Sequence, residues 1–229
     1  MKKTLSIVLL LLAVGVAIWY VSRGGNAQPS TDQPLNEQAV SLVSSGDVSV
    51  VSPVDSKKVA LEAKALEIIS HPVMVKIPIL ESSKKSALAK IEEVADLIRD
   101  NYDYANAWYD LGAYRMVIGD YDGAIEAYEF VISIRPADHV GYANLGDIYG
   151  FYLKNYPLAE ENFLKAIRNN PAYIFGYAEL AVLYEGNFSG GVKKAEDILL
   201  AGLKVNPQDA YLSARLDGLR ERAVANQAP

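Results

Sequence analysis

The chain has 229 residues, of which 51% are hydrophobic, so it can form one or two domains and is too apolar to be wholly disordered. Its 22 basic and 28 acidic residues give a formal net charge of −6, which argues against a nucleic-acid-binding surface because such surfaces depend on basic stripes. Cysteine is absent and only two histidines are present, which excludes disulfides and cysteine-ligated metal sites. We therefore expect no metal ion and no cofactor.

An uncharged run rich in Leu, Val and Ile extends from Thr4 to Val21, behind two lysines. As a helix it would measure about 27 Å, close to the roughly 30 Å hydrocarbon core of a bilayer. The basic groups before the run outnumber the single Arg23 after it, so the positive-inside rule puts the N-terminus in the cytoplasm and the body outside it. Residues 1–23 are thus predicted to be a transmembrane signal anchor. The alternative is a signal peptide cleaved near Ala27, which would leave a secreted or periplasmic protein.

Two segments separate this run from the main body of the chain. Residues 24–56 are dominated by Ser, Val, Gln, Asp and Pro without an aromatic residue, which predicts a disordered linker outside the cytoplasm. Residues 57–84 are predicted to combine a helix with an extended stretch. The composition of residues 57–69 favours the helix, which should end before Pro72. Pro78 then restricts the extended stretch to a sheet edge or a loop.

Between residues 105 and 209 the same residue types recur three times, at intervals of 34 to 36 residues. The recurring columns are Trp108/Tyr142/Tyr177, Leu111/Leu145/Leu180, Gly112/Gly146/Ala181, Ala124/Ala159/Ala195, Tyr128/Phe163/Leu199 and Pro136/Pro171/Pro207. Their helical spacing indicates two helices per unit, in which small residues permit close approach and large ones fill the gaps. One helix pair cannot bury both of its faces, so the units are expected to stack on one another.

This pattern resembles the tetratricopeptide repeat family, whose units read W-x₂-L-G, then A-x₃-Y/F, then P in about 34 residues. The resemblance covers Ala105 to Asp209 and is stronger for the first two units than for the third. Arg115 stands in the first unit where the family often has tyrosine. One extra residue near 152–157 and two near 186–191 predict lengthened turns within the second and third units.

The resemblance implies an all-α fold, a right-handed α-solenoid of three helix pairs with flanking helices. A helical spacing of apolar residues, Leu88, Ile91, Ala95 and Ile98, predicts one flanking helix over residues 85–100. A second one, over residues 210–223, should cap the C-terminal end with its arginines pointing outward. The helical domain is thus expected over residues 85–223, with repeats at 105–138, 139–173 and 174–209.

Residues that could serve catalysis fit the helices better than an active site. Glu160-Glu161 and Glu196-Asp197 are adjacent carboxylates, which do not face each other on a helix and which favour the start of one. Residues 186–194 imitate a phosphate-binding loop but have Val192 where lysine is required. We therefore expect no catalytic residue and no enzymatic activity.

The resemblance also implies a binding groove lined by the first helix of each unit. Carried over to this sequence, the groove residues are Asn106, Tyr109, Asp110, Ala113, Met116, Asn144, Asp147, Phe151, Phe175, Glu179 and Glu185. They include no Lys or Arg, which disfavours a clamp for a peptide's terminal carboxylate. Residues 101–209 carry 15 acidic and 8 basic residues, so we expect the partner to offer a basic and apolar segment.

The leading hypothesis is a non-enzymatic scaffold that is tethered to a membrane through residues 4–21 and recruits a protein or peptide partner in envelope or appendage assembly. One alternative is a solenoid occupied by its own residues 57–80. Another is a secreted or self-associating structural protein. A third, which the tyrosine-rich composition of residues 102–184 suggests, is an enzyme or a carbohydrate-handling protein. No nucleic-acid partner is expected.

Overall fold

The computed structural model describes residues 53–225, which form nine α-helices, one π-helical turn and no strand. The all-α prediction is confirmed for this part of the chain. The predicted anchor, the cleavage site near Ala27 and most of the predicted linker lie outside the described residues. Among residues 53–225, no helix is long and apolar enough to cross a membrane.

The chain divides into two compact units, one ending at Ser70 and the other beginning at His71. The described part of the first unit is helix α2 (Pro53–Ser70). This corrects the predicted linker, whose residues 53–56 are helical; proline fits the first helical position because the first N–H groups of a helix lack intrahelical acceptors. The helix ends before the His71–Pro72 pair, as the restriction on residues preceding proline predicts.

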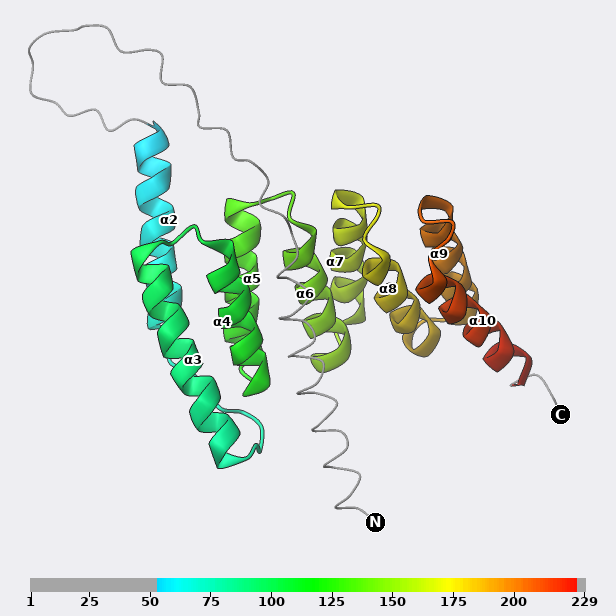
Figure 1. Ribbon diagram of the computed structural model, residues 1–229, viewed down its shortest axis with the longest axis horizontal. Helices are drawn as coiled ribbons and strands as arrows, with labels where there is room; N and C mark the ends of the chain where they lie inside the picture. The colour runs from blue at the N-terminus through cyan, green and yellow to red at the C-terminus, as the bar shows by residue number, and fades with distance from the viewer. Residues whose placement is uncertain (1–52, 226–229) are drawn as a thin grey trace, which may run out of the picture. The chain divides into compact units, whose positions relative to one another are not determined.

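The second unit contains eight α-helices, each packed against the next along the chain (Figure 1). They are α3 (Glu81–Asp100), α4 (Ala105–Val117), α5 (Tyr121–Ile134), α6 (His139–Asp147), α7 (Tyr156–Asn169), α8 (Ile174–Asn187), α9 (Gly191–Val205) and α10 (Ala210–Ala225), with the π-helical turn η1 (Ile148–Tyr152) after α6. The three predicted helix pairs are α4/α5, α6/α7 and α8/α9. Helix α3 begins four residues before the expected start, with Glu81 in its first turn, where a negative charge favours the helix dipole.

The large and small residues of the repeat columns interlock in the core. A Cβ added at Gly112 would lie 2.4 Å from the Tyr128 ring, and one added at Gly146 would lie 2.7 Å from the Phe163 ring. The two rings are almost fully buried, and so is Trp108. Each glycine therefore makes room for the aromatic residue of the paired helix, which confirms that small residues pack opposite large ones.

The insertions in the second and third units are placed differently from expectation. In the second unit the extra residue is absorbed within the first helix, as the π-helical turn η1, and not by a lengthened turn. The Leu153 N–H donates to the Ile148 carbonyl at 2.9 Å, so an i to i+5 bond keeps the backbone satisfied. In the third unit α8 continues to Asn187, and a short turn through Gly190, with φ of 66°, leads into α9.

Candidate protein-binding surface

An extended segment, His71–Leu80, leads into α3 and is called the strap here. The Lys76 N–H donates to the Ile118 carbonyl at 2.9 Å, which joins the strap to the end of α4. The side chain of Ile77 lies over Gly119, where an added Cβ would come within 2.7 Å of it. Gly119 also has φ of 77°, so both its backbone conformation and the close approach favour glycine. In the described part of the chain, this segment is a loop that pairs with no strand.

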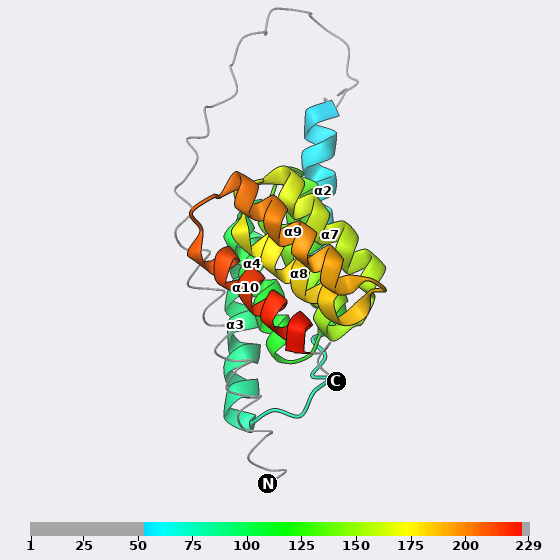
Figure 2. The same cartoon turned by 90° about the vertical axis from the view of Figure 1, so that its right-hand side faces the viewer.

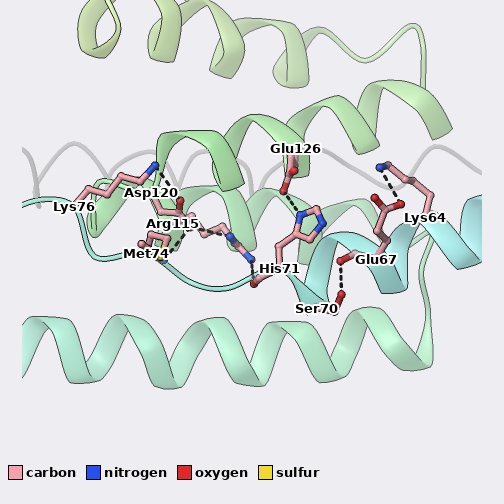
Figure 3. A network of polar contacts seen from close by, with 9 residues as sticks. All are labelled: Lys64, Glu67, Ser70, His71, Met74, Lys76, Arg115, Asp120 and Glu126. Carbon is pink, nitrogen blue, oxygen red and sulfur yellow. Dashed lines mark hydrogen bonds and ion pairs between the residues drawn. The ribbon is translucent and has the colours of Figure 1, made fainter.

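A buried ion pair between Arg115 and Asp120 holds the strap to the first helix pair (Figure 3). The two side chains are 2% and 4% exposed, and their nitrogen and oxygen atoms are 2.8 Å apart. Two further hydrogen bonds join the pair to strap backbone: Arg115 Nη2 donates to the His71 carbonyl at 3.4 Å, and the Met74 N–H donates to Asp120 at 3.5 Å, while the buried Arg115 Nε has no hydrogen-bond partner within residues 53–225. Such additional bonds offset the cost of burying two charges. Arg115, which departs from the family pattern, thus has a specific role in this chain.

Two further contacts tie the strap to α5. His71 Nδ1 lies 2.9 Å from Glu126 Oε2, and Lys76 Nζ lies 2.6 Å from Asp122 Oδ2. The hydrogen bond to Asp122 raises the pKa of Lys76. These contacts fall on the α4–α5 turn and the start of α5, and not on the predicted groove residues.

The eleven predicted groove residues lie on α4, α6, η1 and α8, and together they are called the first-helix surface. Asn106 is exposed, Asn144 is buried, and the remaining nine are half-buried. Phe151 falls in the π-helical turn η1 and not in a regular first helix. Their part in binding stays a prediction.

Each of the three aromatic residues of the first-helix surface packs on another ring. The pairs are Tyr109 with Tyr128 at 6.3 Å between ring centroids, Phe151 with Phe163 at 6.3 Å and Phe175 with Tyr211 at 5.7 Å. Burial also raises the pKa of the Tyr109 hydroxyl, and the neighbouring charge of Asp138 adds to the shift. All three rings thus make packing contacts within the helical domain.

Asp110, Glu179 and Glu185 of the first-helix surface have basic neighbours on the flanking helices. Burial raises the pKa of Asp110 on α4, and the charge of Lys90 on α3 acts in the opposite direction. Burial likewise raises the pKa of Glu179 on α8, where Arg215 on α10 opposes it. The predicted groove residues themselves include no base, so these basic neighbours come from the flanking helices α3 and α10.

Helix α10 contributes the strongest of these contacts. Arg222 donates from Nε and Nη2 to the two carboxylate oxygens of Glu185, both at 2.9 Å, and this pairing lowers the pKa of Glu185. Arg220 pairs with Glu196 on α9 at 2.8 Å. Arg220 and Arg222 are exposed, as the predicted outward orientation requires, and on that face they pair with acids of α8 and α9. The seven-residue spacing of Arg215 and Arg222 puts both on one helix face, but it does not indicate which acids they meet.

The residues considered for catalysis occupy the helical places predicted for them. Glu160 accepts a hydrogen bond from the Tyr184 hydroxyl at 2.7 Å, and Glu161 pairs with Lys165 on α7 at 2.7 Å. Residues 186–194 form the end of α8, a short turn and the start of α9. Within residues 53–225, no cluster of His, Asp and Glu side chains could hold a metal ion.

Comparisons with known proteins agree with the repeat assignment. The family model of the tetratricopeptide repeat matches residues 105–138 and 140–173. No curated protein matches the chain significantly. Two crystal structures of MamA are similar to it, each at 19% identity. The first match covers 65% of this chain and 91% of the MamA chain, with a TM-score of 0.47. The second covers 72% of this chain and 87% of the MamA chain, with a TM-score of 0.49. The chain therefore contains two tetratricopeptide repeats, at residues 105–138 and 140–173, followed by a third helix pair built on the same residue columns.

Proposed function

We propose that this protein is a non-enzymatic scaffold that binds a basic and apolar segment of another protein along the first-helix surface. Tetratricopeptide repeats support the general part of this proposal, since proteins built from them bind proteins or peptides. In the proposed setting, residues 4–21 hold the chain in a membrane, its repeats lie outside the cytoplasm, and the partner takes part in envelope or appendage assembly.

The half-buried carboxylate of Asp110 is the observation that supports a basic residue on the partner. Its carboxylate is half-buried, and burial raises its pKa because it destabilises the ionised form. Within the part of the chain that the structure describes, no base lies within ion-pairing distance of it. Asn106, one helical turn earlier on α4, is exposed and can donate and accept hydrogen bonds. A Lys or Arg of a partner would compensate the charge at Asp110, while neighbouring apolar residues would cover the half-buried surface around it.

The test of binding is a pull-down from solubilised membranes with the full chain, its Asp110→Lys variant and its Asp147→Lys variant. Both substitutions reverse local charge outside the repeat columns, so we expect normal helical content and reduced recovery of the partner. Recovery from the wild type should also fall as salt rises, because charges at an exposed interface attract through screened interactions. Unchanged recovery across the salt series with both folded variants would contradict the assignment to the first-helix surface.

The tether has a separate test, because it rests on residues 4–21 alone. Protease added outside spheroplasts should digest the repeats and leave an N-terminal fragment in the membrane fraction. A mature protein that begins at Gln28 and is released by salt would contradict the anchor and support cleavage near Ala27.

A further inference from the structure

We infer that helix α10 occupies the α8 part of the first-helix surface, so that the basic segment of a partner is confined to the part around Asp110 on α4. This inference rests on the proposed function and narrows it. It divides a surface that the sequence treats as uniform into one part covered by the chain itself and one part open to a partner.

The charges of α8 are matched by α10. Both oxygens of Glu185 accept hydrogen bonds from Arg222 at 2.9 Å, and such two-point, charge-assisted pairs are among the stronger polar contacts in proteins. The charge of Arg215 acts on both Glu179 and Glu185. A basic segment arriving at α8 would have to replace these arginines and would gain little.

The apolar chemistry of α8 is matched by α10 as well. The ring of Tyr211 packs on Phe175 with 5.7 Å between centroids. Helix α10 lies against α8 and α9 (Figure 2), anchored by leucines that are at most 5% exposed: Leu212, Leu216 and Leu219. It therefore presents to α8 the same combination of basic and apolar side chains that is expected of the partner.

The surface around Asp110 differs because the flanking helix there does not pair with the acid. Lys90 of α3 donates to Glu93 of its own helix at 2.6 Å and acts on Asp110 only through its charge. Asp110 forms no ion pair among residues 53–225. A partner's base can approach this carboxylate without first displacing one that belongs to the chain.

The experiment measures binding of a labelled acetyl-Lys-Phe-Lys-Phe-Lys amide to the full chain in uncharged detergent, by fluorescence anisotropy at low and high salt. Asp110→Lys should weaken binding about tenfold, equivalent to about 1.4 kcal/mol. The double variant Arg215→Ala with Arg222→Ala should bind more tightly than the wild type, because it opens α8. Matched controls are Glu92→Lys, an equal charge reversal on the exposed side of α3, and Arg220→Ala, which removes an α10 arginine that pairs with α9. Both controls should bind as the wild type does.

The other outcomes overturn the inference in distinguishable ways. Binding only by the double arginine variant would show that the wild-type surface is closed throughout, which contradicts the open part at Asp110 while the proposed function survives. Wild-type binding that resists Asp110→Lys but is lost in the double arginine variant would move the site onto α10. Absence of binding by every variant, or equal binding by all of them, would contradict both the inference and the basic partner of the proposed function.

Discussion

In the first helix pair, the residue three positions after Gly112 is Arg115, which forms a buried pair with Asp120 and bonds to the strap. In the third pair, the residue three positions after Ala181 is Tyr184, whose hydroxyl donates to Glu160 on the preceding pair. The same column thus reaches backward in both units. Among residues 53–225 no other repeat pair precedes the first unit, and the strap supplies the backward contact there. In this protein a short extended segment and a buried ion pair thus stand where the third pair contacts the pair before it.

The largest expected effect tests whether the large aromatic residues of the repeat columns are buried alike in the first and third helix pairs. Trp108→Ala and Tyr128→Ala in the first pair, and Tyr177→Ala in the third, should each lower the free energy of unfolding by about 3–5 kcal/mol, the range for truncating a large buried aromatic residue. All three side chains are at most 4% exposed. Urea denaturation followed by circular dichroism measures the effect. A loss below about 0.5 kcal/mol, typical of surface sites, would show that the column is misassigned.

The second prediction separates the two units at the Arg115 column. Arg115→Ala leaves the Asp120 carboxylate buried without its partner and should cost about 3–5 kcal/mol. Tyr184→Phe removes one hydrogen bond to Glu160 and should cost only about 0.5–1.5 kcal/mol. The control is Arg115→Met combined with Asp120→Leu, which removes both charges and should recover most of the stability. Equal losses for Arg115→Ala and Tyr184→Phe in denaturation curves would remove the contrast between the units.

A third, smaller effect concerns the small-residue column. Gly112→Ala should cost about 1–3 kcal/mol, because its Cβ would overlap the buried Tyr128 ring. The reverse change in the third pair, Ala181→Gly, should cost about 0.5–1 kcal/mol through added backbone freedom in α8. Thermal unfolding of the two variants gives the ranking. If Gly112→Ala proves neutral, the helices of the first pair can separate without loss, and the close approach is not required.

The smallest effects concern how pH changes the contributions of Asp110, in the first helix pair, and Glu185, in the third, to stability. The pKa of Glu185 is lowered by Arg222, so its contribution to stability is present above the unfolded-state pKa of about 4.3 and is lost as pH falls through the folded-state value. The pKa of Asp110 is raised by burial, so its ionised form costs stability, and that cost is relieved as pH falls through its folded-state value. Melting temperatures measured from acidic to neutral pH should therefore show Glu185→Gln less stable and Asp110→Asn more stable than wild type at pH 7. Both differences should disappear at low pH. Differences of the opposite sign would reverse the assigned environments.

Much of the fold could be predicted because the repeat columns are local in sequence. Trp108, Gly112 and Tyr128 lie within one unit, and their spacing alone indicates two helices that pack closely. The contacts that could not be predicted join residues far apart in the sequence: Arg115 with His71, and Glu185 with Arg222. Each depends on which helix face meets a flanking element. The same limit applied to the predicted groove, whose acids could be identified while the bases of α3 and α10 could not be placed beside them.

The π-helical turn η1 determines where a binding residue must be introduced when it is transferred by substitution from one repeat of this protein to another. One residue of an α-helix turns the chain by about 100°, and η1 holds one residue more than the corresponding turn of α4. When the two repeats are aligned without a gap, every residue of the second repeat after Ile148 is therefore shifted by one position. It faces the direction that the alignment assigns to the residue before it. A binding residue grafted from α4 onto the second repeat keeps its direction up to Ile148, and beyond that point it must be placed one position later.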